Sequence, residues 1–447
     1  MAQYKFEGDF GNITEAQLDF INKVVQEQNL DVNKVVFVPV GKPGDNFASN
    51  VKRIRIEGNN GNMNMIIKIA PQGEAQRMTF FSDIVFQNEH FMYVVLLPKL
   101  VSLQKEAGVP EEELLRFAKC YGSFTEAPNE IIILEDLCES DYVMLDKFES
   151  LSDECMKSVL KTFAIFHSLS YALKHKEPDT FEYYKSQLTD VWSLMAENPV
   201  FKTQTEVFVM AVQALLEEEE HKNIVKNKFA DVFNLMTKLN KWEQNNKHSV
   251  IQQGDAWTNN IMFKIGEDKV QTVMIDFQGS KNNNPVADLL YAIFNCTDHE
   301  TRSKHFFDWI DYYHVELENS LSNFGLKANY IYSKDQLDAD IKRYGKLMFG
   351  VSVMLANLLM RDTNEASEIM EAMKTTADMK ELMESMGSQG TNTEFSFNNE
   401  NLMYTEVLPK LVALQKAAGV PEEEHLRYAK CFGALSEAPN EIIMLEI

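Results

Sequence analysis

The sequence predicts an α+β protein, with a small β-rich part followed by a larger, mainly helical part. Alternating stretches rich in β-branched residues lie within residues 34–70, whereas apolar residues with helical spacing dominate from about residue 140 to residue 372. One strand–turn–strand pattern, at 260–277, interrupts the helical part. With 45% hydrophobic residues, the 447-residue chain can bury large cores, which excludes global disorder.

The β-rich part begins with a helix. Residues 14–28 have helical apolar spacing behind Thr14, a candidate N-cap. A long helix is expected over 82–106, ended by Gly108, and a short strand at 130–135 closes this part. Between the two helices, turn residues separate three expected strands: 34–40, 51–57 and 63–70.

The charge and the cysteines of the chain indicate which binding partners and which cellular compartment to expect. It has 43 basic and 67 acidic residues, a net charge of −24, and no block of five or six basic residues, which argues against nucleic-acid partners and anionic lipid surfaces. No stretch of about 18 uncharged apolar residues is present, so we expect no membrane span. The first residues lack an apolar signal region and the five cysteines form no C-x-x-C pair, so we expect a reduced, cytosolic compartment.

The densest polar motif, QGDAWTNN at 253–260, comes directly before the expected hairpin. Asn260 follows Asp255 by five residues, and Asp276 ends the second strand of the hairpin. This arrangement suits phosphoryl transfer from ATP, in which the first aspartate accepts or orients a hydroxyl proton and the other two residues hold Mg²⁺. Taken singly, each piece also fits a turn with an Asx cap or a strand-end carboxylate.

The β-rich part contains candidate nucleotide-binding residues. Lys68 lies inside an apolar strand, where burial is costly unless it is paired, and Glu89 on the following helix is the natural partner. Such a pair holds the α and β phosphates in kinases, although a lysine reaching water from an edge strand is the alternative. The loop with Gly44, Asn46 and Ser49 can cover phosphates with its N–H groups, and a plain hairpin turn is an equal interpretation.

Eight motifs occur in a fixed order along the chain: GKPGDNFAS (41–49), IIKIA (66–70), EHFMYVVLLPKL (89–100), IIILEDL (131–137), FAIFHSLSYALK (163–174), QGDAWTNNIMF (253–263), MIDFQ (274–278) and PVADLLYAIF (285–294). As an ordered set, they resemble the ecdysteroid-kinase-like proteins of insects (the CHK-kinase-like group), within the choline kinase and aminoglycoside phosphotransferase fold. The resemblance covers most of residues 1–372. It implies a two-lobed protein-kinase-like fold with a small antiparallel β lobe and a mainly helical lobe.

The resemblance also implies an activity and a nucleotide site. The activity would be the ATP- and Mg²⁺-dependent phosphorylation of a hydroxyl group on a small molecule, such as a steroid-like or xenobiotic alcohol. Lys68 and Glu89 would bind the phosphates. The connector from Glu135 to Leu137 would meet adenine with its backbone.

In the helical lobe, the resemblance assigns catalysis to Asp255 and Mg²⁺ binding to Asn260 and Asp276. Asp288 would be a structural carboxylate that holds the catalytic loop. One residue departs from the family pattern, because Gln253 stands where the motif usually has histidine. Glutamine also donates and accepts hydrogen bonds, so we interpret the change as tolerated, but it keeps a non-catalytic pseudokinase as the alternative function.

A protein kinase is a weaker alternative. Only twelve positions separate Asp276 from Asp288, and the A-P-E motif that ends a protein-kinase activation segment is missing. The sequence therefore favours a small-molecule acceptor. His167, on an apolar helix, is expected to be a hydrogen-bonded core histidine and not a ligand.

The chain also contains an internal repeat. Residues 86–135 and 397–446 align without a gap at an offset of 311, with 35 of 50 positions identical. The second copy has Glu400 as the counterpart of Glu89 but has no counterpart of Lys68 or Asp255, so we expect no second active site. We therefore predict four regions: a nucleotide-binding lobe at 1–137, a helical lobe at 138–372, a linker at 373–396, and a truncated repeat of residues 86–136 at 397–447.

Overall fold

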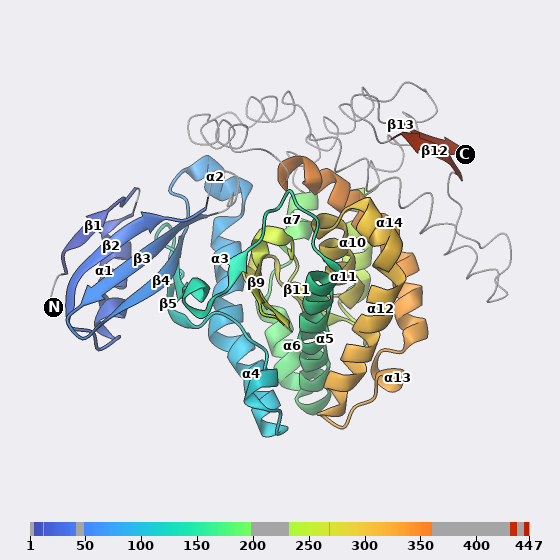
Figure 1. The fold of residues 1–447 in the computed structure, drawn as a ribbon, viewed down its shortest axis with the longest axis horizontal. Coiled ribbons are helices and arrows are strands. Elements are labelled where there is room, and N and C mark those ends of the chain that lie inside the picture. The colour runs from blue at the N-terminus through green and yellow to red at the C-terminus, as the bar shows by residue number, and fades with distance from the viewer. Residues whose placement is uncertain are drawn as a thin grey trace.

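A computed structural model of the chain describes residues 4–11, 13–41, 49–197, 232–267, 269–359, 430–435 and 442–446. Within these residues, a six-stranded sheet lies at one end of the molecule and a helical body lies beside it (Figure 1). The predicted α+β class, with a small β-rich part before a larger helical part, is confirmed.

The six-stranded sheet has the strand order β1-β2-β3-β4-β6-β5. All neighbouring strands are antiparallel except β1 and β2, which run parallel. The strands expected from the sequence are β2, β3, β4 and β6, and the structure adds β1 and β5. Their bounds are β1 Phe6–Gly8, β2 Val32–Pro39, β3 Asn50–Gly58, β4 Gly61–Ile69, β5 Cys120–Phe124 and β6 Ile131–Glu135.

Helix α1 (Glu15–Gln26) covers one face of this sheet. Thr14 caps the helix, because its hydroxyl accepts from the Gln17 backbone N–H while the Gln17 side chain accepts from the Thr14 backbone. Alternate strand residues and α1 form the core on this face: Ile21, Val24, Val25, Val35, Phe37, Ile54, Ile56, Met65 and Ile67. Because successive side chains of a strand point to opposite faces, Lys68 lies on the other face of the sheet.

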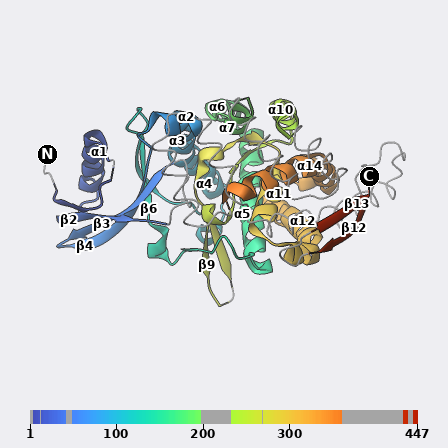
Figure 2. The same cartoon turned by 90° about the horizontal axis from the view of Figure 1, so that it is seen from above.

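The helix expected at 82–106 is interrupted by a π-helical turn. After the short helix α2 (Glu74–Thr79), it consists of α3 (Ser82–Phe91), the π turn (Met92–Leu96) and α4 (Leu97–Glu106). Pro98, near the start of α4, has no amide hydrogen, so the regular bonding of an α-helix cannot continue at this point. Seen from above, α3 and α4 lie between the sheet and the helical body (Figure 2).

The helical body is built around α5, α11 and α12, whose buried side chains include Phe163, Leu290, Trp309 and Tyr313. The expected hairpin is β9–β10, which β7 extends, and β8 pairs with β11 in a separate small ladder. No helix in the described part of the chain is both long and apolar enough to cross a membrane. The helices are α5 Asp153–Lys176, α6 Pro178–Gln187, α7 Val191–Glu197, α10 Val232–Glu243, α11 Pro285–Cys296, α12 His299–Ser322, α13 Ala328–Ile331 and α14 Lys334–Leu359, and the strands are β7 Val143–Met144, β8 Val250–Gln252, β9 Ile261–Ile265, β10 Val270–Met274 and β11 Lys281–Asn283.

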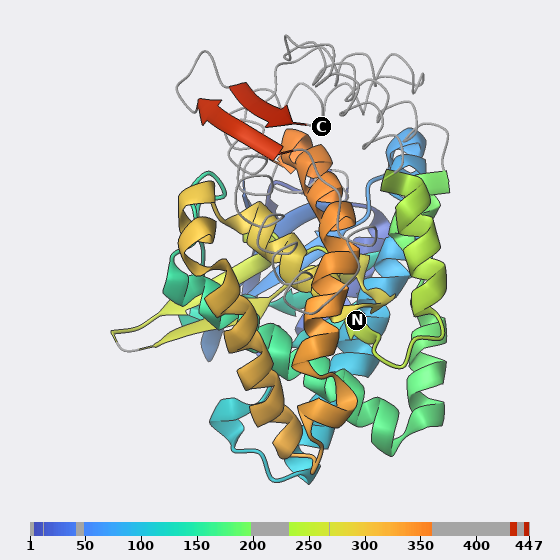
Figure 3. The same cartoon turned by 90° about the vertical axis from the view of Figure 1, so that its right-hand side faces the viewer.

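A two-stranded hairpin lies apart from the large sheet, on the far side of the helical body (Figures 1 and 3). Its strands, β12 (Lys430–Leu435) and β13 (Ile442–Glu446), pair in the register of β5 and β6 shifted by 311 residues. Both hairpins also have an irregular register directly after their cysteine, Cys120 or Cys431. The linker and the rest of the repeat lie outside the described residues, so the proposed division into four regions stays a prediction.

Candidate functional site

Lys68 on β4 joins two carboxylates from different parts of the chain. Its Nζ atom lies 2.7 Å from Glu89 Oε2 on α3 and 2.7 Å from Asp276 Oδ1 after β10. Burial disfavours a charged lysine, but Asp276 and Glu89 outweigh this effect and hold the pKa of Lys68 above its usual value. The structure therefore brings the predicted Lys68–Glu89 pair together. The role of this pair in phosphate binding stays a prediction.

Asp276 reaches Lys68 from an unusual backbone conformation. Its φ angle is 58°, in the left-handed region that few residues other than glycine adopt. The Asp276 carboxylate also accepts a hydrogen bond of 3.4 Å from the Gln278 N–H, and the Phe277 ring packs edge-on against Tyr93 at 5.3 Å. Unusual backbone of this kind occurs often at functional sites, where surrounding contacts hold it in place.

The loop that carries Asp255 is held by Asp288 on α11. The Asp288 carboxylate accepts hydrogen bonds of 2.9 Å from the N–H groups of both Gln253 and Gly254. Gly254 has a φ angle of 87°, and a Cβ atom there would lie 2.1 Å from the carbonyl oxygen of Gly279, so only glycine fits. The buried His167 binds Asp288 through Nε2 and Tyr313 through Nδ1, which confirms the expectation of a hydrogen-bonded core histidine.

Gln253 connects this loop with the segment that carries Asp276. Its Nε2 atom donates to the carbonyl oxygens of Ile275 at 3.0 Å and Asp276 at 2.7 Å. Its Oε1 atom accepts from the Asp255 N–H at 2.6 Å. The residue that departs from the family motif thus fixes the two loops relative to each other.

Asp255 and Asn260 contact each other within one loop. Asn260 Nδ2 donates to the Asp255 carbonyl oxygen at 2.9 Å and to its Oδ2 at 3.1 Å, and the Tyr291 hydroxyl donates to Oδ1. Burial raises the pKa of Asp255 to about 7, against the hydrogen bond from Tyr291. Tyr291 was not among the site residues predicted from the sequence. Its position three residues after Asp288 on a predicted helix was the available signal, because this spacing places both side chains on one face.

The glycine-containing loop is described only at its end. Ser49 is buried directly before β3, whereas Gly44 and Asn46 lie outside the described residues. A role for these three residues in covering phosphates stays a prediction.

The connector after β6 is fastened to the sheet by ion pairs. The Glu135 carboxylate pairs with Arg116, and Asp136 pairs with Arg53 on β3, which the sequence analysis missed. Asp136 is buried, and so is Leu137 at the start of a 3-10 turn. These contacts fix the connector beside the face of the sheet that carries Lys68, where Glu135 and Leu137 were predicted to meet adenine.

The oxygen atoms of the site suit Mg²⁺ as a hard cation. Asp276 offers a carboxylate, and the Asn260 amide oxygen is available because its nitrogen makes both contacts to Asp255. In the described part of the chain, no cluster of three or more His, Cys, Asp or Glu residues could hold a metal ion. Two protein oxygens nevertheless fit Mg²⁺, which often takes its remaining ligands from phosphate and water.

The model of the ecdysteroid kinase-like family matches residues 43–326 and 343–446, which is more than half of the chain. The chain belongs to the ecdysteroid kinase-like family. The family resemblance that the ordered motifs indicated is therefore confirmed. A comparison with curated protein sequences returned no match.

Among solved structures, the family member is similar to three small-molecule kinases at low identity. An ethanolamine kinase from Plasmodium vivax is 13% identical, with 83% of this chain and 88% of that chain covered and a TM-score of 0.39. A spectinomycin phosphotransferase in complex with ADP and spectinomycin is 13% identical, with 85% and 99% covered and a TM-score of 0.40. An aminoglycoside phosphotransferase from Streptomyces rimosus, in complex with ADP and streptomycin, is 11% identical, with 75% and 98% covered and a TM-score of 0.32.

Proposed function

We propose that the protein is an ATP- and Mg²⁺-dependent kinase that phosphorylates a hydroxyl group of a small alcohol. One observation carries the proposal: Lys68, paired with Glu89, contacts Asp276, and Gln253 joins the segment of Asp276 to the loop of Asp255. The Lys–Glu pair, the metal-binding aspartate and the catalytic aspartate are the parts that phosphoryl transfer requires. Membership of the ecdysteroid kinase-like family supports the same chemistry.

In the proposed reaction, each residue acts mainly by position and charge. Lys68, fixed by Glu89, attracts the donor phosphates, while Asp255 orients the acceptor hydroxyl and accepts its proton. As the new bond between the acceptor oxygen and the γ-phosphorus forms, the bond from that phosphorus to the β–γ bridging oxygen breaks and ADP leaves. Asn260 and Asp276 would hold Mg²⁺, which would supply positive charge to the phosphates. Holding the two reacting groups at the correct distance accounts for much of the expected rate enhancement.

The acceptor is proposed to be a small molecule and not a protein. The residues between Asp276 and Asp288 form a 3-10 turn, the strand β11, which pairs with β8, and the start of α11. This span therefore contains no free segment of the kind that docks a peptide in protein kinases. The family name supports a steroid-like alcohol as the substrate class, and a xenobiotic alcohol is the other acceptor that the motif resemblance implies.

A non-catalytic binding protein is the second candidate, and Gln253 at the usual histidine position is the observation that favours it. The contacts of Gln253 weaken this candidate, because the side chain supports both loops of the site. A thermal-shift titration with ATP and Mg²⁺ separates the two functions. A kinase is expected to be stabilised by the nucleotide, whereas an unchanged melting temperature would favour the binding protein.

The acceptor can be found by incubating the protein with a metabolite extract and labelled ATP, and by reading phosphorylated products with mass spectrometry. Asp255→Asn should abolish product formation and keep ATP binding nearly intact, because this residue acts on the acceptor. Asp298→Asn is the matched control, since the Asp298 carboxylate caps α12 by accepting from the Thr301 N–H and asparagine is an equally favourable cap residue. Equal turnover of Asp255→Asn and the wild type would refute the assigned role.

A further inference from the structure

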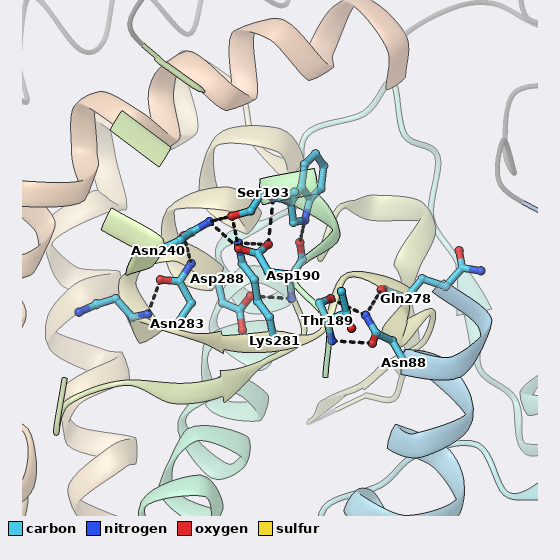
Figure 4. Close-up of polar contacts among 12 residues, drawn as sticks. Asn88, Thr189, Asp190, Ser193, Asn240, Gln278, Lys281, Asn283 and Asp288 are labelled. Atoms are coloured by element: carbon cyan, nitrogen blue, oxygen red, sulfur yellow. Dashed lines mark hydrogen bonds and ion pairs between the residues drawn. The ribbon is translucent and has the colours of Figure 1, made fainter. Parts of the chain in front are cut away.

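Residues 189–193, called here the bridging segment, consist of the end of the connection between α6 and α7 and the first three residues of α7 (Figure 4). They contact α3, which carries Glu89, and the loop that carries Asp255. Nothing in the sequence pattern indicated a role for them. Their contacts are hydrogen bonds and one ion pair, made with residues from α3, the catalytic loop, α10 and β11.

One end of the bridging segment is fixed to α3 by Asn88, the neighbour of Glu89. Asn88 Nδ2 donates to the Thr189 carbonyl oxygen at 2.8 Å, and Asn88 Oδ1 accepts from the Thr189 N–H at 2.9 Å. The same nitrogen also donates to the Gln278 carbonyl oxygen at 3.2 Å. Asn88 is 1% exposed, so α3 cannot move away from Lys68 without breaking buried hydrogen bonds.

The other end of the segment is fixed to the catalytic loop. Trp192 Nε1 donates to the carbonyl oxygen of Gly254, the residue before Asp255, at 3.1 Å. The segment therefore spans from the residue beside Glu89 to the residue beside Asp255.

The middle of the segment is anchored by a partly buried ion pair. Lys281 Nζ lies 2.8 Å from Asp190 Oδ1, and Asn240 Nδ2 donates to Asp190 Oδ2 at 2.7 Å. Burial opposes ionisation of Asp190, but Lys281 and Ser193 outweigh it and hold the pKa of the carboxyl below its usual value. Because breaking the pair would leave the buried Lys281 charge uncompensated, this anchor holds the segment in position.

We propose that the bridging segment is a positioning element that couples the Lys68–Glu89 pair to the catalytic loop, with Asn88 and Trp192 as its two contact residues. The functional consequence of this coupling rests on the proposed kinase function, because the coupling would align the nucleotide-binding residues with Asp255. The physical coupling itself is a property of the protein without any ligand. It can therefore be tested separately from the activity.

The first test measures hydrogen exchange in the peptide that spans residues 251–262. Asn88→Ala should accelerate exchange of the Gln253 and Gly254 N–H groups about tenfold, because the segment that fixes the loop loses its anchor on α3. Gln104→Ala is the matched control. Gln104 lies on α4, which continues α3, and its buried side chain accepts a hydrogen bond from the Leu115 N–H, so this variant also removes a buried side-chain amide. The inference would be overturned if the peptide exchanged at the wild-type rate in Asn88→Ala, or if both variants accelerated its exchange equally.

The second test uses kinetics with ATP and the acceptor from the metabolite screen. Asn88→Ala should raise KM for ATP about tenfold, and Trp192→Phe, which keeps the aromatic packing, should lower kcat about tenfold with KM within about twofold. In the double variant, the loss in kcat/KM should be smaller than the product of the two single losses, because both residues act through one segment. Losses that multiply would show independent sites and contradict the coupling. If the wild-type protein did not bind ATP, the proposed function would be refuted. The hydrogen-exchange experiment would still show whether the segment couples α3 to the catalytic loop.

Discussion

Gln253 stands where the ecdysteroid kinase-like motif usually has histidine, and its contacts define what this position requires. Two carbonyl oxygens, of Ile275 and Asp276, need a donor, and the N–H of Asp255 needs an acceptor. A glutamine amide supplies all three bonds at once, whereas a neutral histidine has one donor and one acceptor. The departure from the motif is therefore compatible with a fixed catalytic loop.

The hydrogen bonds of Gln253 predict different effects for two substitutions of this residue. Gln253→Leu should lower the free energy of unfolding by about 2–4 kcal/mol and kcat by about 100-fold, because buried backbone groups lose their partners and both loops loosen. Gln253→His should keep kcat within about tenfold of the wild type. Urea denaturation and turnover of both variants check the prediction. Wild-type turnover of Gln253→Leu would show that the loops are held by other contacts.

The site residues that could be predicted from the sequence have partners close to them along the chain, whereas the residues that were not predicted have distant ones. Asp255 and Asn260 belong to one loop, so their spacing alone indicated that they act together. Asn88 and Thr189 are 101 positions apart, and no local pattern links an asparagine on a helix with a backbone amide so distant. Contacts of this kind depend on how the elements pack, which single-sequence periodicity does not contain.

At the scale of elements, the strands with alternating apolar residues were predictable and the shortest ones were not. β2, β3 and β4 bury every second side chain against α1, which produces a clear two-residue period. β8 and β11 have only three residues each, too few to show a period, and they are fixed by pairing with each other. These two strands nevertheless place Gln253 and the segment after Asp276 side by side.

Helix α11 carries Asp288 and Tyr291, and its C-terminal end depends on one buried arginine. Arg302 on α12 donates to the carbonyl oxygens of Phe294 at 3.4 Å and Ile293 at 3.5 Å and also to Thr297. A cation here satisfies carbonyl groups that the helix itself leaves unpaired and lies favourably at the negative end of the helix dipole.

Arg302→Met should therefore lower the free energy of unfolding by about 3 kcal/mol, because several buried carbonyl groups lose a charged donor. ATP binding by the folded fraction should stay unchanged, since the hydrogen bonds of Arg302 given above are made at the C-terminal end of α11 and not with Lys68, Asp255 or Asp276. Lys304→Met on the same helix is the matched control, and it should change stability by less than about 0.5 kcal/mol because Lys304 is exposed. Equal stability of the two variants in urea denaturation would contradict this role for Arg302.

At the scale of the whole molecule, the described residues of the candidate site come from the β-rich part and from the helical body, and none of them comes from the second copy of the repeat. Lys68, Glu89, Asp255 and Asp276 come from β4, α3 and two loops of the helical body. The described strands of the second copy, β12 and β13, lie on the far side of that body (Figure 1). With a net charge of −24, the proposed kinase would need Lys68 and Mg²⁺ to make its site favourable to ATP.

Deleting residues 385–447 should accordingly leave turnover within about twofold of the wild type, because the removed residues include none of the proposed site. Turnover and the nucleotide-induced thermal shift of the truncated protein check this prediction. A loss of most of the activity on deletion would show that the second copy supports the site. It would also refute the interpretation of this copy as a catalytically inactive fragment.

The repeat provides an internal control for the same prediction, because equivalent positions can carry the same substitution. Glu89→Gln should weaken ATP binding about tenfold or more, since the neutral amide no longer fixes the charged Lys68. Glu400→Gln, at the equivalent position 311 residues later, should leave ATP binding unchanged because the second copy has no counterpart of Lys68. Isothermal titration with ATP and Mg²⁺ distinguishes the two variants, and an equal loss of affinity in both would mean that the copies share one function.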